Sequence, residues 1–289
     1  MTTHVEPTGT HRTLDEVIND IAGLQPLGAI ATQILAITES DRFSAHELAK
    51  LISSDQALST KMLRLSNSAY YGFPRAITTV RDAIVLLGFR AVRSATLASC
   101  VIDAVPGGAN LDYQQFWHYS VTVGMLAELL ARVEDTPHDE AFTAGVIHNI
   151  GRLALDQYAP EQFRQALELA RESEMSLLDA EREVLGFTDA ELGGGLALHW
   201  NFPPPLVDAV AHHHLNVYAL PEPQSLAASV VRARLFVSSL GICDGTAQAV
   251  TSAPPAEWTV PPISVALDRG GGVDGVLERV GAFMETTIR

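Results

Sequence analysis

The chain has 289 residues with 47% hydrophobic content, and its formal net charge is −15, from 19 Lys and Arg against 34 Asp and Glu. That length and composition suit a folded protein with a sizeable core, and the acidic balance argues against nucleic acid or anionic lipid as a partner. No apolar run reaches the roughly 20 residues needed to span a bilayer, and residues 1–12 lack the apolar core of a signal peptide, so we expect a cytoplasmic protein without membrane contact.

The N-terminal part of the chain predicts a helical bundle. Residues 1–13 are polar, contain Pro7 and Gly9, and are typical of a disordered leader. Apolar residues then recur with helical spacing as far as Val105, so we assign residues 14–105 to an N-terminal helical subdomain. Helix starts are indicated by residues that commonly cap helices, at Ser44, Asp55 and Thr79.

A second helical block is expected over residues 106–243, after a break at Val105 to Gly108. Its first helix is marked by apolar residues in steps of three and four, at Phe116, Tyr119, Val123, Leu126 and Leu130. Further helices are indicated near residues 142–150, 161–172, 177–185, 189–199, 204–212 and 225–240. Gly193 to Gly195 are costly in a helix interior, about 1 kcal/mol each relative to alanine, which predicts either a very close neighbour or an interrupted helix.

The C-terminal residues 244–289 change in composition. Prolines, including Pro254 and Pro261, and the glycines of 270–272 are typical of a linker, so we expect a flexible tail with a short helix at 273–287. Neither an internal repeat nor a convincing series of alternating strands is present. The pattern therefore predicts an all-α fold.

Several of the ten histidines lie in the second block, at His118, His148, His199 and His212 to His214. A helical metal-hydrolase site needs neutral imidazoles and carboxylates that converge from several helices, commonly with an adjacent His-Asp pair. Here the adjacent pair is His148 and Asn149, and an amide carries no negative charge. Cys100 and Cys243 lie far apart without zinc-ligand spacing, so neither a disulfide framework nor a zinc knuckle is expected.

Five segments, in a fixed order, form a pattern that is more specific than any single histidine motif. They are DQALSTKMLRLSNSAYYGFPRAITTVRDAIVLLGFRAVRS (Asp55 to Ser94), FWHYSVTVGMLAELLA, AFTAGVIHNIGRLAL, LGFTDAELGGGLALHWNFPPPLVDAVAHHH and LAASVVRARLF. The chain resembles the HDOD proteins over about Leu24 to Leu240; they are a branch of the HD phosphohydrolase superfamily found in bacterial signalling. The resemblance implies that the N-terminal bundle packs on an HD-like helical subdomain, residues 106–243.

The resemblance also indicates where catalytic relatives hold metal. Their ligands are a histidine on the FW-led helix, a His-Asp pair and a later aspartate. The first position falls on Tyr119, with His118 one place early, and one place on a helix is a rotation of about 100°. The pair falls on His148 and Asn149, and the late aspartate on Arg234. Three of the four positions therefore lack the expected ligand.

This substitution pattern predicts a protein that is not an enzyme and that holds no metal or other cofactor. An amide and a guanidinium in place of two carboxylates cannot offset the hydration that a divalent ion loses on binding. We expect a regulatory signal-transduction module that binds another signalling protein. The alternative is a metal-dependent phosphohydrolase centred on His118, His148 and the late histidines.

Other residues suggest ligand or partner contacts. Tyr70, Tyr71 and Arg75 are of the types that anchor protein interfaces, although packing between helices explains the tyrosines more simply. His213 and His214 suit capping of a helix end better than metal ligation.

A nucleotide is a further alternative ligand. Arg152 and Arg234 would receive the phosphate of a cyclic dinucleotide or guanosine tetraphosphate if the vacated pocket binds one. The basic cluster of Arg75, Arg81, Arg90 and Arg93 suits either a solvated helix face or one phosphate-bearing ligand.

Overall fold

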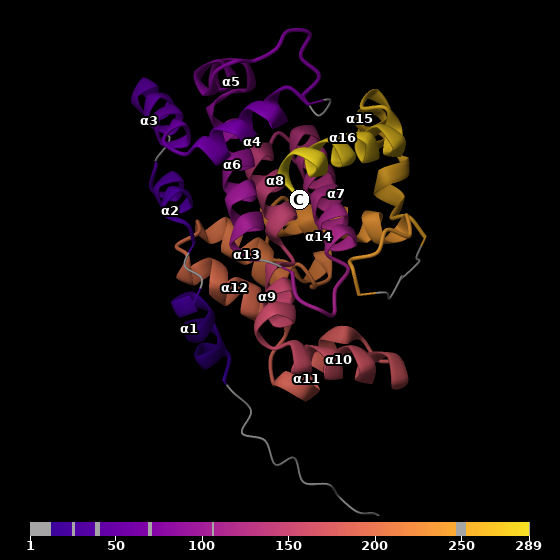
Figure 1. The fold of residues 1–289 in the computed structure, drawn as a ribbon. Coiled ribbons are helices and arrows are strands. Elements are labelled where there is room, and N and C mark those ends of the chain that lie inside the picture. The colour runs from indigo at the N-terminus through magenta and orange to yellow at the C-terminus, as the bar shows by residue number, and fades with distance from the viewer. Residues whose placement is uncertain are drawn as a thin grey trace, which may run out of the picture.

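The structure is a computed structural model that describes residues 13–24, 27–37, 41–68, 71–105, 107–246 and 253–288, the side chains of 22–24 and 41–44 excepted. Within these ranges the regular structure is helical without a strand, which confirms the predicted all-α fold (Figure 1). No helix there is both long enough and apolar enough to cross a membrane. Residues 1–12 of the predicted leader, and Tyr70, lie outside the described ranges.

Within the described residues the N-terminal block contains six helices: α1 (Leu14–Leu24), α2 (Ala29–Ala36), α3 (Asp41–Ser53), α4 (Gln56–Ser66), α5 (Val80–Leu87) and α6 (Phe89–Ala104). Two predicted caps are confirmed, because Asp55 Oδ1 accepts a hydrogen bond from Leu58 N at 2.8 Å and Thr79 Oγ1 accepts one from Asp82 N at 3.0 Å. The predicted cap at Ser44 is wrong, since α3 already begins at Asp41. Helix α1 lies beside α12 (Asp189–His199) of the second block in Figure 1, and the two helices are in contact.

The second block contains eight α-helices: α7 (Tyr113–Val133), α8 (His138–Ile147), α9 (Ile150–Tyr158), α10 (Pro160–Glu172), α11 (Leu177–Leu185), α12 (Asp189–His199), α13 (Pro204–His212) and α14 (Leu226–Ser239). Helix α7 runs through the middle and contacts α8, α14 and the C-terminal helix α16 (Gly272–Thr287). The five apolar residues from Phe116 to Leu130 that marked its predicted stripe are all buried. Helix α7 therefore carries the centre of the core.

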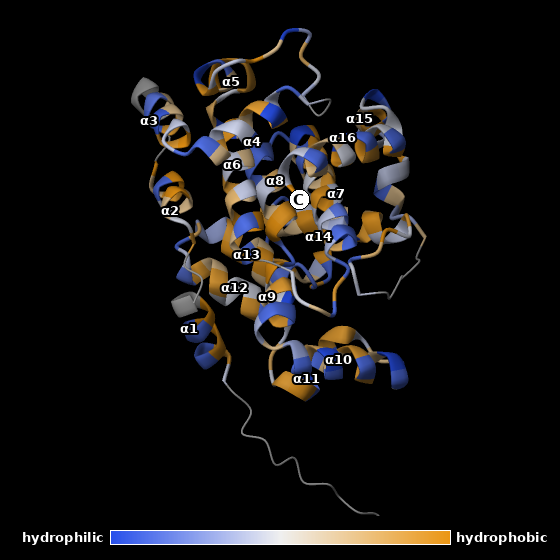
Figure 2. Cartoon of the chain, viewed as in Figure 1, coloured by the Kyte–Doolittle hydropathy of each residue, from blue (hydrophilic) through white to orange (hydrophobic). Residues whose placement is uncertain are grey.

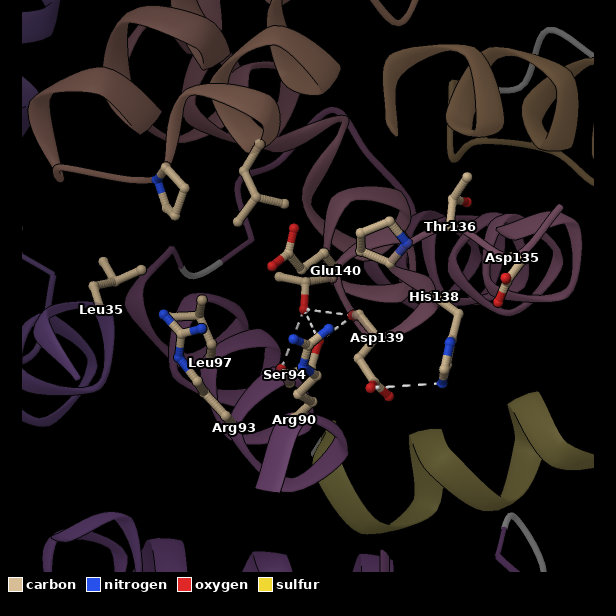
Figure 3. A pocket seen from close by; sticks show the side chains of 14 residues that line it. Leu35, Arg90, Arg93, Ser94, Leu97, Asp135, Thr136, His138, Asp139 and Glu140 are labelled. Atoms are coloured by element: carbon tan, nitrogen blue, oxygen red, sulfur yellow. Dashed lines mark hydrogen bonds and ion pairs between the residues drawn. The ribbon is translucent and has the colours of Figure 1, made fainter. Parts of the chain in front are cut away.

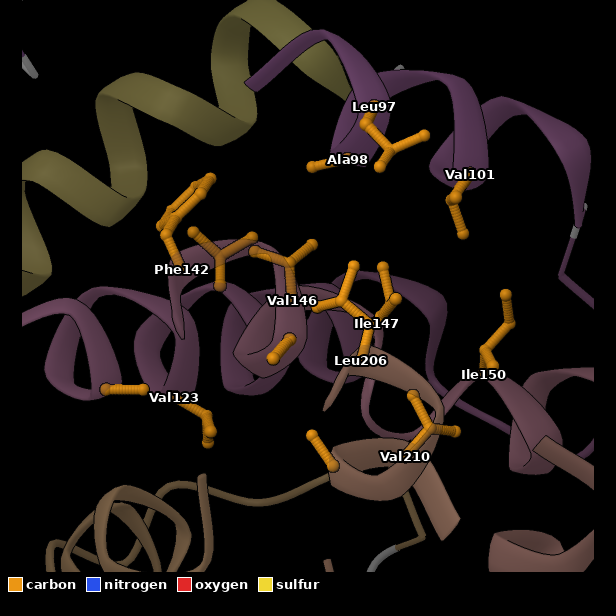
Figure 4. Close-up of a cluster of buried hydrophobic side chains, with 14 of the residues drawn as sticks. Leu97, Ala98, Val101, Val123, Phe142, Val146, Ile147, Ile150, Leu206 and Val210 are labelled. Atoms are coloured by element: carbon orange, nitrogen blue, oxygen red, sulfur yellow. The ribbon is translucent and has the colours of Figure 1, made fainter. Parts of the chain in front are cut away.

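The two blocks share one continuous core. Figure 4 shows Leu97, Ala98 and Val101 of α6 facing α8, and Leu206 and Val210 of α13 close by; all five side chains are buried. Full burial of each Leu or Val side chain contributes about 1.5–3 kcal/mol. The break in the sequence pattern at residues 105–108 therefore does not mark a gap in the packing between the two blocks.

For residues 253–288 the prediction of a flexible tail is wrong, whereas the short helix predicted at 273–287 is confirmed by α16. Residues 253–288 form a 3₁₀ turn, η2 (Ala256–Thr259), and two helices, α15 (Ile263–Arg269) and α16 (Gly272–Thr287). Helix α16 packs on α7 and α4, and the fully buried Phe283 contacts the Phe142 ring with centroids 5.6 Å apart. Val276, Val280 and Phe283 recur at helical spacing, and this short apolar stripe outweighs the local linker-like composition.

Candidate functional site

The candidate site is a buried group of polar side chains inside the second block. His148 lies in the turn between α8 and α9, and His213 and His214 follow α13. Ring centroids are 5.0 Å apart for His148 and His213 and 3.9 Å for His213 and His214. The Asp189 carboxylate on α12 lies 3.1 Å from His214 Nε2. These three histidines and Asp189 are called the histidine cluster below.

Two of these histidines have a fixed tautomer. His148 Nδ1 donates to the Gly145 carbonyl at 2.6 Å, and His213 Nδ1 donates to the Val210 carbonyl at 2.7 Å. Because a carbonyl only accepts, the proton of each neutral ring is on Nδ1 and Nε2 carries a lone pair. Both Nε2 atoms are buried and find no hydrogen-bond partner within the described residues, and the same holds for Asn149 Oδ1. The cluster therefore presents acceptors without partners.

A buried arginine pairs with two carboxylates beside the cluster. Arg152 Nη2 lies 3.1 Å from Asp189 Oδ2, and Arg152 Nη1 lies 2.5 Å from Asp244 Oδ2. The Arg152 side chain is 3% exposed and that of Asp189 is fully buried. Burial alone would raise the pKa of Asp189, but Arg152 and His214 hold it well below the ordinary value. Asp189 is therefore ionised and paired.

Close contact of two helix backbones sets this geometry. A Cβ atom on Gly151 of α9 would collide with the Asp189 carbonyl oxygen, and would lie only 2.6 Å from Gly193 N of α12. The side chain of the next residue, Arg152, is thereby brought against Asp189. Helix α12 runs unbroken through Gly193 to Gly195, so of the two predicted explanations for these glycines a very close neighbour is the one found.

A second arginine adds positive charge at the same place. Arg234 on α14 donates from Nε to the His213 carbonyl at 3.0 Å. Burial, opposed by the Gly145 hydrogen bond and reinforced by the charges of Arg234 and other neighbours, lowers the pKa of His148 to about 3. Burial and His214 likewise lower the pKa of His213. Both rings are therefore neutral near pH 7.

The structure brings together most of the residues that the HD pattern singled out. The Tyr119 ring centroid lies 5.8 Å from that of His148, whereas His118, one place earlier on α7, is half-buried. Asn149 is buried directly after His148. Tyr71 and Arg75 belong to the loop between α4 and α5, outside the histidine cluster.

The expectation that Arg152 receives a phosphate stays a prediction, and Arg152 is paired within the protein. Its two terminal nitrogens already contact Asp189 and Asp244, so its positive charge is paired with carboxylates of the protein itself. Sequence reasoning missed both carboxylates, and it also missed Glu181, whose Oε2 accepts a hydrogen bond from Asp189 N at 2.8 Å. The only local signal was the capping box of Thr188 and Glu191, which places Asp189 at the start of a helix without showing which partner it meets.

The residues do not fit an HD-type metal. Asp189, His213 and His214 each offer a ligand atom, and these atoms lie within 4.8 Å of one another. However, Arg152 neutralises that single carboxylate, and Arg234 stands where the pattern requires another. A divalent ion would meet two guanidinium groups within a low-dielectric interior, where like charges repel strongly.

A separate cavity of about 310 Å³ lies between the two blocks (Figure 3). Arg90 and Arg93 of α6 line it, together with Asp139 and Glu140 of α8. Arg93 Nε donates to the Ile34 carbonyl at 3.3 Å. Carboxylates and arginines in one lining offset each other, so this cavity is a poor site for a simple phosphate.

Comparison with known proteins agrees with the fold. The structure superposes on an HDOD domain protein of Geobacter sulfurreducens (TM-score 0.75, 22% identity, 96% of this chain and 98% of the other). Similar values hold for a proposed phosphohydrolase of Shewanella amazonensis SB2B (TM-score 0.71, 25% identity, 96% and 98%). A proposed signal transduction protein of Marinobacter aquaeolei VT8 has a TM-score of 0.68 and 19% identity over 97% of this chain and 66% of its own.

A curated relative and a family model complete the comparison. An uncharacterised protein of Treponema pallidum (strain Nichols) is 25% identical over 237 residues, and this chain spans 46% of the length of that protein. The family model of the HDOD domain matches residues 24–216. Since this match covers more than half of the sequence, the chain belongs to the HDOD family.

Proposed function

We propose that this protein acts in the cytoplasm as a regulatory module of signal transduction, which binds another protein and does not catalyse a reaction. The observation that carries the proposal is the buried ion pairing of Arg152 with both Asp189 and Asp244. An internal cation holds the negative charge that a hydrolytic metal would need. Membership of the HDOD family, and the likeness to a proposed signal transduction protein, agree with a regulatory role.

The lack of catalysis follows from charge. A divalent ion must recover its lost hydration from oxygen and imidazole ligands. His148 and His213 supply neutral nitrogens, but the charges of Asp189 and Asp244 are already offset by Arg152, which pairs with both, and by the nearby Arg234. Without a metal to lower the pKa of water from 15.7 to about 7, the cluster has no hydroxide nucleophile at neutral pH.

Elemental analysis of protein purified without a histidine tag tests the proposal, combined with a phosphodiester hydrolysis assay on the same sample. We expect metal well below one equivalent and no turnover above the buffer rate. Stoichiometric metal together with turnover that His148→Ala abolishes would overturn it.

The second candidate function is metal-dependent phosphohydrolysis. The approach of ligand atoms from Asp189, His213 and His214 to within 4.8 Å favours it, as do the unpartnered Nε2 atoms of the cluster. One similar solved structure is described as a proposed phosphohydrolase. This alternative predicts that His148→Ala and His213→Ala each lose both bound metal and turnover, while His199→Ala, outside the cluster, keeps both.

A further inference from the structure

The chain has one strongly basic stretch. Residues 60–105 contain six basic residues and two acidic ones, a net charge of +4, whereas the whole chain carries −15. Lys61 is paired with Asp103 at 2.6 Å. Arg75 and Arg81 are exposed, and within the described ranges neither pairs with a carboxylate; Arg81 Nη2 lies 3.4 Å from His46 Nδ1. Positive charge is therefore available on this part of the surface.

Apolar side chains are exposed on the same elements. Helix α5 buries Val80, Ala83 and Ile84 but leaves Val85 75% exposed and Leu86 54% exposed. Arg81 and Val85 are four residues apart and so lie on one face of the helix. Figure 2 shows this outer helix carrying both hydrophobic and hydrophilic residues. Exposed apolar groups rimmed by charge mark interaction sites.

A cavity of about 270 Å³ opens beside these residues. Its walls include Phe73, Leu86 and Leu87 from the N-terminal block, and Phe142 from α8. Glu128 and Asp139 also line it, but Glu128 pairs with Arg132 at 2.6 Å and Asp139 Oδ2 lies 3.6 Å from His138 Nε2. Phe73 is itself 36% exposed at the mouth. A leucine-sized side chain that enters this cavity buries apolar area against Phe73, Leu86 and Phe142, and buried apolar contacts of this kind anchor interfaces.

We propose that this region binds an acidic segment of another protein that carries apolar side chains. The region is called the α5 surface and comprises Phe73, Arg75, Arg81, Val85 and Leu86, with the adjoining cavity. An apolar side chain of the partner enters the cavity, and its carboxylates meet Arg75 and Arg81. This inference rests on the proposed function, because it names the partner chemistry of a module that acts by binding.

Charge and chemistry favour this occupant over the others. Nucleic acid would have to approach a chain with a net charge of −15, and the exposed Val85 and Leu86 offer nothing to a phosphate. Two copies of the chain repel each other through the same net charge. An acidic, partly apolar peptide segment satisfies both the arginines and the cavity.

The test is a fluorescence anisotropy titration of the full chain with two synthetic amphipathic peptides. Both carry leucines on one face, and the other face carries glutamates in the first peptide and lysines in the second. We expect binding of the glutamate peptide that weakens as salt rises, with no binding of the lysine peptide. Arg81→Glu and Val85→Ser should each weaken binding by about tenfold. Both positions are exposed, so folding is not at risk.

Matched controls lie elsewhere on the surface. Arg269→Glu reverses an exposed charge on α15, and Leu198→Ser removes a side chain that is 66% exposed on α12. Neither should change the affinity. The inference is overturned if the glutamate peptide does not bind, if Arg81→Glu and Val85→Ser leave its binding unchanged, or if the lysine peptide binds as well. Dimers in sedimentation that Arg81→Glu disperses would assign the α5 surface to a second copy and also overturn it.

These outcomes are separable from failure of the proposed function. Metal content and phosphodiester turnover decide whether the module is catalytic, and they do not involve the α5 surface. Loss of peptide binding with no metal and no turnover rejects the α5 surface alone. Turnover that depends on His148 rejects the proposed function whether or not the peptide binds.

Discussion

The histidine cluster and the α5 surface use arginine in opposite settings. Arg152 is 3% exposed and lies between two carboxylates, whereas Arg81 is exposed and pairs with no carboxylate of the described residues. In a low-dielectric interior the first arginine is bound to its partners by the cost of leaving either charge alone. The second retains its charge for a partner outside the chain. Burial and pairing, and not residue type, therefore separate a structural cation from a binding one.

Arg152→Met should give the largest effect of the variants that test this contrast. The change leaves Asp189 and Asp244 without their cation, and an unpaired buried charge costs about 3–5 kcal/mol. Urea denaturation should show that loss in the free energy of unfolding. Arg81→Met is the matched control, and we expect it to stay within about 0.5 kcal/mol of the native chain. An equal loss in the free energy of unfolding for Arg152→Met and Arg81→Met would contradict the distinction between a structural and a binding arginine.

The helix crossing beneath the cluster gives a second test. Gly151→Ala places a methyl group against backbone atoms of α12, which cannot move aside as a side chain does. Overpacking of this kind costs about 1–3 kcal/mol. The control is Gly281→Ala in α16, where no atom lies within 4 Å of the added methyl group, and it should stabilise the helix by about 0.5–1 kcal/mol. If Gly151→Ala does not lower the temperature of thermal unfolding, the close crossing is wrong.

The cluster also predicts how stability depends on pH. The pKa of His148 is lowered to about 3 in the folded chain, so between pH 6.5 and about 3 the unfolded chain binds a proton that the folded chain does not. Stability is therefore complete above pH 6.5 and falls below it, by about 1.4 kcal/mol per pH unit for this residue. The lowered pKa values of His213 and His214 act in the same direction. Glu181, whose pKa is raised by burial and by Asp189, opposes them.

Denaturation at a series of pH values measures this slope, and His148→Gln removes one titrating group from it. We expect the variant to lose about 1.4 kcal/mol per pH unit of the acid dependence. An unchanged slope would mean that His148 is protonated in the folded chain and is not the neutral ring described above.

Sequence reasoning reached the fold more completely than the site. Helical spacing and capping residues such as Asp55 and Thr79 act within a few neighbouring positions, so they can be predicted from the sequence alone. The pairing of Arg152 with Asp189 and Asp244 joins residues far apart in the chain, and no local pattern encodes it. The packing of the C-terminal region was missed for a related reason. The terminal helix was predicted, but the ring that Phe283 packs against, Phe142, lies on α8, and α16 as a whole packs on α7, so the composition of the tail does not show that it is held.

The smallest expected effect belongs to the α5 surface itself. Val85 is 75% exposed, so Val85→Ser removes little buried apolar area and should change the free energy of unfolding by less than about 0.5 kcal/mol. The same variant should weaken glutamate-peptide binding by about tenfold, which is the signature of a side chain that serves a partner and not the core. A loss of stability above about 1 kcal/mol in urea denaturation would show instead that Val85 packs within the chain. The α5 surface would then present its exposed arginines without the apolar side chain of Val85 beside them, and the contrast with the buried Arg152 would rest on charge alone.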